Sequence, residues 1–143
     1  MNERFLFRGK RKDNGEWVTG YLIQGNKTYI ATTEAINYMV VSTSYMASIK
    51  LVEVIPETVG QYTGLKDKNG KLIFEEDIIK TKEYGRDIGH SNVNNFDIFK
   101  VIYEPAVFRL ENVRRGFNLV GNGNDFEIIG NIHDNPELLE VER

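Results

Sequence analysis

The stretch VGQYTGLKDKNGKLIFEEDIIK, Val59–Lys80, decides the fold. At its centre, Asp67–Gly70 (Asp-Lys-Asn-Gly) is a strong hairpin signal, because Asn and Gly tolerate the positive φ angles of a type I′ turn. Apolar residues lie on both sides of this turn, and Leu72–Phe74 continues out of it as a strand. We therefore predict that antiparallel β-structure, rather than helix, organises the chain.

Short strand signals recur on both sides of this stretch. Before it, the turn Asp13-Asn14-Gly15 precedes the β-branched and aromatic run Trp17–Ile23, which predicts a meander. After it, five or six short strands separated by turns predict a small barrel or a strongly bent sheet. Asn135-Pro136-Glu137 near the end is a helix-start signature.

The predicted fold is therefore mainly β, with two lobes. A small N-terminal β-meander lobe covers residues 1–57. A compact C-terminal lobe, either a bent sheet or an SH3-like barrel, covers residues 58–143 and ends in a short helix. Residues 83–98 are rich in Gly, Asn, Asp and Ser, which predicts a mobile loop. Residues 31–48 fit helix and strand equally well, and both readings stay open.

Composition bounds the class of protein. Of the 143 residues, 41% are hydrophobic and 27% charged, which is typical of a globular domain. The chain has no cysteine, which excludes disulfides and fits a reducing compartment. No apolar run approaches the ~20 residues of a membrane span, so we expect no membrane association. The net charge of −3 is uneven, with six Lys/Arg and three acids in residues 1–30 but one Arg and six acids in residues 125–143.

Three segments together resemble the YopX family of phage- and prophage-encoded proteins: Val59–Lys71, Ile73–Ile79, and Ile129–Ile132 running into Asn135–Leu139. One departure is visible, because the family often has Gly where this chain has Glu76 before Asp77. The resemblance implies a mainly β fold and an origin in bacterial mobile elements, hence the cytoplasm of a bacterial host. It implies no activity and carries over no catalytic residue.

The residues themselves show no catalytic constellation. The central loop matches a calcium loop in part, but Leu65 stands where the first carboxylate ligand is needed, so a plain β-turn accounts for it better. Three acids in a row at Glu75, Glu76 and Asp77 cannot all face one site on a strand, and we predict a solvated corner. His90 and His133 have no partner at a spacing that makes a metal site or a triad. We therefore expect no catalytic residue, no metal and no cofactor.

The basic and aromatic N-terminus is the best nucleic-acid candidate, since Lys and Arg bind phosphates and exposed aromatic rings stack on bases. Against it, a small β core would bury the same aromatic residues, and basic edges also prevent strands from aggregating. The candidate residues are Arg4, Arg8, Lys10, Arg11, Lys12 and Trp17.

The leading functional prediction is a phage- or prophage-encoded binding or assembly protein without enzymatic activity. Its expected partners are further copies of the chain, another protein or nucleic acid. A small nucleic-acid-binding module that uses the basic, aromatic N-terminus is the first alternative. A small enzyme built on the acidic corner is the second.

Overall fold

The structure is a computed structural model that describes residues 5–32, 37–41, 44–48, 50–82, 96–112, 116–119 and 125–139. The chain divides into two compact units, Met1–Tyr62 and Thr63–Arg143, whereas the sequence places a boundary at residues 57/58. The described elements are strands apart from two short 3₁₀ helices, so the prediction of a mainly β fold is confirmed.

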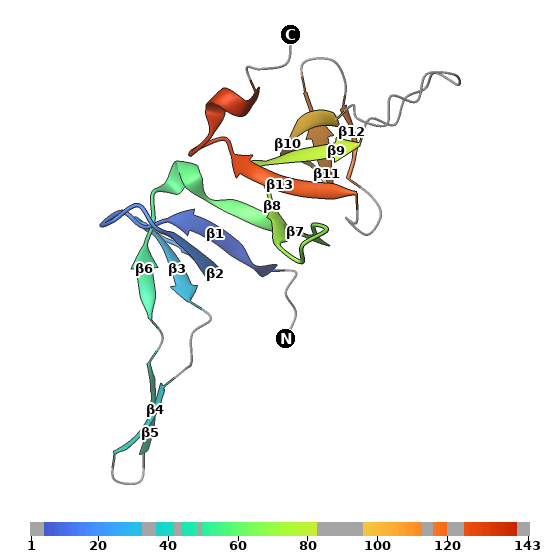
Figure 1. Cartoon of the computed structure of the whole chain (residues 1–143). Coiled ribbons are helices and arrows are strands. Elements are labelled where there is room, and N and C mark those ends of the chain that lie inside the picture. The colour runs from blue at the N-terminus through green and yellow to red at the C-terminus, as the bar shows by residue number, and fades with distance from the viewer. Residues whose placement is uncertain are drawn as a thin grey trace, which may run out of the picture. The chain divides into compact units, whose positions relative to one another are not determined.

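The N-terminal unit is a meander of short antiparallel strands (Figure 1). Two of them fall in the segment for which helix and strand were both open, and they are paired strands. The elements are β1 (Phe7–Lys10), β2 (Trp17–Gln24), β3 (Thr28–Thr32), β4 (Asn37–Val41), β5 (Ser44–Ser48), β6 (Leu51–Glu53) and the 3₁₀ helix η2 (Pro56–Thr58).

Four of these strands close into a small barrel. Strands β1, β2, β3 and β6 follow one another as neighbours in the sheet. The free edge of β6 then meets the end of β1, where Arg11 and Val54 form an antiparallel bridge. The backbone N–H of Lys12 donates to the Glu53 carbonyl at 3.0 Å, and that of Ile55 donates to the Lys10 carbonyl at 2.8 Å. The sheet therefore closes on itself, which satisfies the backbone groups of two edges.

The barrel interior is apolar and tight. Ile30, Val52 and Val54 are at most 7% exposed. Two glycines allow the strands to approach one another. A Cβ on Gly9 would lie 3.0 Å from the Val54 side chain, and one on Gly20 would lie 1.9 Å from the carbonyl oxygen of Ala31. Glycine is therefore required at position 20 by the close approach of β2 and β3.

Strand β7 (Gly60–Lys66) begins in the N-terminal unit, where its first residues pair with β1, and ends in the C-terminal unit. The C-terminal unit contains an antiparallel sheet in the order β12-β11-β10-β9-β13. Its further elements are β8 (Leu72–Phe74), β9 (Asp77–Lys82), β10 (Phe96–Glu104), β11 (Val107–Glu111), β12 (Gly116–Asn118), β13 (Phe126–Asn131) and the 3₁₀ helix η3 (Pro136–Leu139).

The core of this unit lies on one face of the sheet, where β8 also contributes a side chain. Six buried residues form it: Ile73, Ile79, Phe99, Val101, Leu110 and Phe126. The short helix η3 contacts β10, and Leu138 and Leu139 in it are half-buried. No helix within the described ranges is both long and apolar enough to span a membrane.

The central hairpin is present, but its turn is not of type I′. That type needs positive φ at both central residues, and among Asp67–Lys71 only Gly70 has it, with φ 81°. The Gly70 N–H donates to the Asp67 carbonyl at 3.0 Å, as in a type I turn that is followed by a left-handed glycine.

The predicted mobile loop at residues 83–98 falls largely outside the described residues. Its last part was predicted wrongly, because Phe96–Ile98 belongs to β10, where it pairs with Lys80–Lys82 of β9. Pairing with a neighbouring strand overrides the polar composition that suggested a loop.

Candidate functional site

Two of the predicted basic residues, Arg8 and Lys10, lie over the ring of Trp17. The Arg8 guanidinium carbon is 4.7 Å from the ring centroid, and the Lys10 ammonium nitrogen is 5.6 Å from it. Both distances are within the range of a cation–π interaction. The register explains this arrangement: Lys10 lies directly opposite Trp17, and Arg8, two residues along β1, lies on the same side of the sheet. All three side chains are half-buried.

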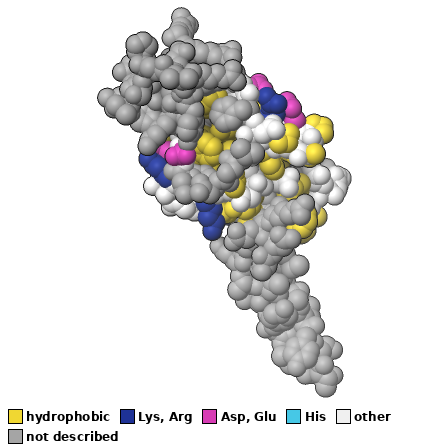
Figure 2. All heavy atoms as spheres, turned by 90° about the vertical axis from the view of Figure 1, so that its right-hand side faces the viewer, with side chains coloured by type: hydrophobic (Ala, Val, Ile, Leu, Met, Phe, Trp, Pro, Cys, Tyr) yellow, Lys and Arg dark blue, Asp and Glu magenta, His cyan; other side chains and the backbone are white. Residues whose placement is uncertain are grey.

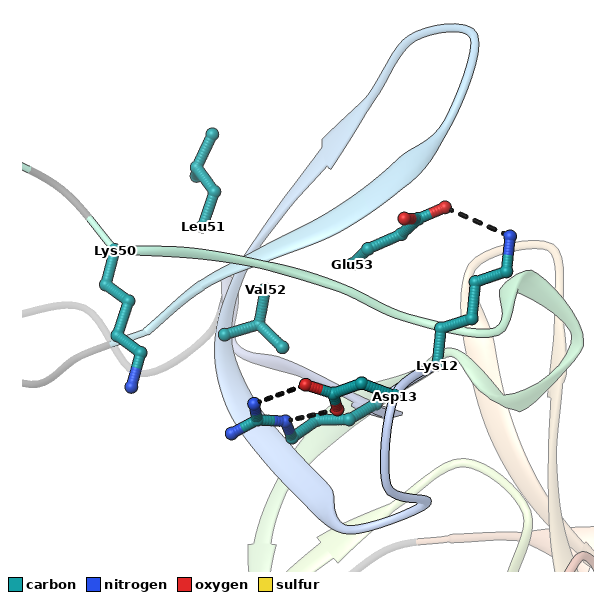
Figure 3. Close-up of a pocket in the computed structure, with 7 residues that line it drawn as sticks. Lys12, Asp13, Lys50, Leu51, Val52 and Glu53 are labelled. Atoms are coloured by element: carbon teal, nitrogen blue, oxygen red, sulfur yellow. Dashed lines mark hydrogen bonds and ion pairs between the residues drawn. The ribbon is translucent and has the colours of Figure 1, made fainter.

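Two other predicted residues, Arg11 and Lys12, bond to acidic side chains. The Arg11 Nε and Nη2 atoms donate to the two Asp13 carboxylate oxygens at 2.9 and 2.7 Å. This hydrogen bond, more than the charge of the guanidinium, holds the pKa of Asp13 below its ordinary value. The Lys12 Nζ lies 3.3 Å from Glu53 Oε1 (Figure 3). The Lys27 Nζ lies 4.0 Å from the other oxygen of the same carboxylate.

A shallow pocket of about 420 Å³ lies beside these ion pairs (Figure 3). Its two carboxylates, Asp13 and Glu53, both bond to cations of the same lining, so we regard the pocket as a product of the ion pairs and assign it no ligand. The lining residues are Arg11, Lys12, Asp13, Lys50, Leu51, Val52 and Glu53.

Of the six candidate residues, the structure therefore gathers three and pairs two with acids. The sixth, Arg4, lies outside the described residues. The three that come together are Arg8, Lys10 and Trp17.

The outer side of the barrel extends this group with further aromatic and aliphatic residues. Tyr21 and Ile23 lie four and six residues after Trp17 along β2, on the same side of the strand, and Tyr29 lies opposite Ile23 on β3. Ile23 is 43% exposed and Leu51 of β6 is 49% exposed. We call this surface the outer face and define it by Arg8, Lys10, Trp17, Thr19, Tyr21, Ile23, Tyr29, Leu51 and Glu53. Glu53, its acidic member, is ion-paired with Lys12 and Lys27.

Sequence reasoning did not include Ile23, Tyr29 or Leu51 in the candidate site. A signal for them exists in the alternation of β2, where every second residue from Trp17 to Ile23 leaves the barrel on the same side. Figure 2 shows hydrophobic side chains at the surface on one side of the molecule. Phe5 and Tyr103, which are not part of the outer face, are 55% and 50% exposed, so exposure alone would not have identified this face.

The acidic corner of the C-terminal unit is a connected structure. Glu76 has a left-handed φ of 73°, which a glycine adopts without cost and other residues do not. Its N–H donates to the Val101 carbonyl at 2.7 Å, and its carbonyl accepts from the Ile132 N–H at 3.0 Å. Its carboxylate Oε2 contacts Nε2 of His133. The chain thus makes this turn with a glutamate in a backbone conformation that favours glycine.

The prediction of a solvated corner was wrong for Asp77, which is 1% exposed. Its carboxylate accepts a hydrogen bond from the Phe74 N–H at 2.8 Å and so closes the turn from β8 to β9. A buried carboxylate that accepts a backbone N–H at a turn stabilises the local fold.

Asp67 in the central loop also serves the fold. One of its carboxylate oxygens accepts from the N–H groups of Asn69 and Lys71, both at 2.9 Å, and the other accepts from the Ile128 N–H at 3.1 Å. Asp67 is 4% exposed. The carboxylate that a calcium loop would turn toward an ion is directed here at backbone N–H groups of the hairpin and of β13.

Within the part of the chain that the structure describes, no three His, Asp or Glu side chains are grouped as metal ligands. His133 contacts Glu76, and the other histidine, His90, lies outside the described residues.

The fold and the surface define a class: a two-unit antiparallel β protein whose N-terminal barrel carries aromatic and basic side chains on its outer face. A family model described as "YopX protein" matches residues 6–140. The chain belongs to the YopX family.

Among solved structures, the chain is similar to one described as "Crystal structure of protein EF1440 from Enterococcus faecalis". The two share 24% sequence identity and a TM-score of 0.61, over 93% of this chain and 96% of that one. This similarity supports the fold and says nothing of activity. No curated protein matches the chain significantly.

Proposed function

We propose that this YopX-family protein is a non-enzymatic binding protein that holds a single-stranded nucleic acid on its outer face. The observation that carries the proposal is the position of Arg8 and Lys10 over Trp17, in line with Tyr21 along β2. Phosphate-binding cations and base-stacking rings on one sheet are the elements of a single-strand platform.

The geometry favours a single strand over a duplex. Aromatic rings can stack only on bases that are unpaired and splayed out. Arg8 and Lys10 lie two residues apart on β1, which places them about 6.6 Å apart along the strand. A flexible single strand can follow this row with its phosphates while its bases turn toward Trp17 and Tyr21. A duplex keeps its bases stacked inside and offers these rings no partner.

The whole-chain charge of −3 opposes nonspecific attraction of a polyanion, so binding depends on the local group of cations. The N-terminal thirty residues contain six Lys/Arg and three acids, so this part of the chain is the more favourable one for binding a polyanion. Arg11 and Lys12 lie beside this group of cations and are ion-paired with Asp13 and Glu53.

A protein partner on the same face is the second candidate. Ile23 and Leu51 are 43% and 49% exposed, and exposed aliphatic residues beside aromatic ones are typical of protein interfaces. An assembly role in a phage or prophage, in the cytoplasm of the bacterial host, is consistent with both candidates and belongs to the proposal.

The test is the binding of fluorescently labelled oligonucleotides of about 12 nucleotides, measured by anisotropy at low salt. Two double variants are compared, Arg8→Gln/Lys10→Gln on the outer face and Arg11→Gln/Lys12→Gln beside it. Both lose two positive charges from the same segment, so the whole-chain charge is matched. Circular dichroism confirms that both remain folded.

We expect the outer-face variant to bind at least tenfold more weakly. The slope of log K against log salt should also become less steep by about 1.4, because each lost phosphate contact with a single strand removes about 0.7 from it. The control variant should change the affinity much less. The proposal fails if no oligonucleotide binds at low salt, if duplex binds as tightly as single strand, or if the two variants weaken binding equally.

A further inference from the structure

The hairpin β4–β5 forms a sheet of its own. It lies in the chain between β3 and β6, and its five residue pairs run from Asn37 opposite Ser48 to Val41 opposite Ser44. Among the described strands, neither β4 nor β5 pairs with a third strand, so both outer edges of the hairpin carry no ladder (Figure 1). We call this hairpin, residues 37–41 and 44–48, the arm.

An isolated two-stranded hairpin is marginally stable in water, and three or more strands are needed for a stable sheet. The pair β3–β6 continues as far as Thr32, whose N–H donates to the Lys50 carbonyl at 3.1 Å, and it holds the base of the hairpin together. This base supplies two strands only, so a third strand on one edge of the arm would stabilise it further.

The sequence of the arm is unusual for an edge. Residues 35–49 contain no Asp, Glu, Lys or Arg, in a chain of which 27% of residues are charged. They also contain no proline. Natural edge strands are normally protected from pairing by charges, by proline or by bulges. The arm has five regular pairs without a bulge, so its edges remain competent to pair.

We propose that the arm pairs edge to edge with the arm of a second copy, which forms a four-stranded antiparallel sheet across a twofold axis. Two identical edges without charges do not repel each other. Such an edge also has no charge that would favour a different, oppositely charged partner. An antiparallel edge also satisfies twofold symmetry by itself, since each residue pair is repeated by the axis.

The symmetry makes the register testable. When a five-residue strand pairs in full with its own copy, the central residue lies opposite itself. The central residue is Met46 if the β5 edges meet and Met39 if the β4 edges meet. A charge introduced at the correct centre therefore faces the same charge in the other copy.

The first experiment measures the oligomeric state by sedimentation velocity from about 5 to 500 µM, because a small strand interface is expected to be weak. Lysine and glutamate are introduced separately at Met39 and at Met46. The wild-type protein should associate, and at one of the two positions both the lysine and the glutamate variant should be monomeric. Mixing these two variants should restore association, since opposite charges then face each other.

The control is the pair Gln24→Lys and Gln24→Glu, which places the same charges on an exposed residue of β2 that is not part of the outer face. These control variants should associate like the wild type. A second readout uses the absence of cysteine in the chain: a single Met39→Cys or Met46→Cys can form a disulfide only between copies. The variant at the correct centre should form disulfide-linked dimers under mild oxidation.

Three results would overturn the proposal. The first is a monomer across the whole concentration range. The second is association that persists in all four charge variants, which would place the interface elsewhere. The third is association that is lost in a charge variant and not restored by mixing, which would exclude self-pairing at that register. Oligonucleotide binding through the outer face is measured separately and can succeed or fail independently.

Discussion

Replacing Glu76 separates two opposing contributions to the stability of the corner between β8 and β9. The left-handed φ of 73° costs a residue with a Cβ about 1–2 kcal/mol relative to glycine. A glycine at this position would itself lower the free energy of unfolding by about 0.5–1 kcal/mol, because glycine loses more backbone freedom on folding. The contact between the Glu76 carboxylate and His133 opposes the strain, and a half-buried hydrogen bond of this kind contributes about 1 kcal/mol.

These magnitudes give different expectations for two variants. Glu76→Ala keeps the strained backbone and loses the bond, so it should lower the free energy of unfolding by about 1 kcal/mol. Glu76→Gly loses the same bond and relieves the strain, so its stability should lie close to that of the wild type. The two variants should therefore differ by about 1 kcal/mol, or about 3 °C in melting temperature.

Urea denaturation followed by circular dichroism measures both variants on the same scale. His133→Ala is the companion variant, since it removes the bond without changing the backbone at position 76. Glu76→Gly should then be more stable than His133→Ala. Equal stability of the alanine and glycine variants at position 76 would refute the assignment of backbone strain, whatever the contribution of the bond.

Two further predictions concern buried contacts, each with a matched control. Asp67→Ala removes the acceptor of three backbone N–H groups from a site that is 4% exposed, and it should cost about 3 kcal/mol in urea denaturation. Asn69→Ala in the same turn should change stability by less than about 0.5 kcal/mol, and an equal loss in both would contradict the role of the carboxylate. Gly20→Ala would place a Cβ 1.9 Å from a backbone oxygen and should cost about 2 kcal/mol or more, visible as a lower melting temperature. Gly25→Ala, which has open space around its Cβ position, should be nearly neutral, and a neutral Gly20→Ala would refute the close approach of β2 and β3.

The parts of the fold that the sequence predicts are those set by local chemistry. Asn-Gly turns and β-branched runs identify the hairpins, and their order gives the meander. The start of β10 could not be read in this way, because Phe96–Ile98 follows a polar segment and is a strand only through pairing with β9. The choice between helix and strand at residues 31–48 was open for the same reason, since cross-strand partners decide it.

The corner at Glu76 shows why contacts between distant residues escape sequence reasoning. Glu76 and His133 are 57 positions apart in the sequence, and the pairing of β13 with β9 brings them together. The sequence offers one signal at this corner, the glutamate that departs from the family resemblance, and the structure gives Glu76 a positive φ of 73°. Nothing in the triplet of acids indicates that Asp77 is buried, since burial is set by the sheet that forms around it.

The candidate surface was predictable in part. The basic, aromatic composition identified Arg8, Lys10 and Trp17, and the hairpin register brings them onto one side of the sheet. Composition could not show that Arg11 and Lys12 form ion pairs with Asp13 and Glu53, because the conformation of the loop and the position of β6 bring these side chains together.

Trp17 is the single tryptophan of the chain, so its emission can report directly whether a nucleic-acid strand occupies the outer face as proposed. Its emission is measured while unlabelled single-stranded oligonucleotide is added at low salt. A strand on the outer face should give a saturable change in emission that follows the binding curve and is reversed by added salt, since bases stack on the ring and phosphates hold the strand. Emission that stays constant while anisotropy reports binding would place the nucleic acid on another surface and contradict the proposal.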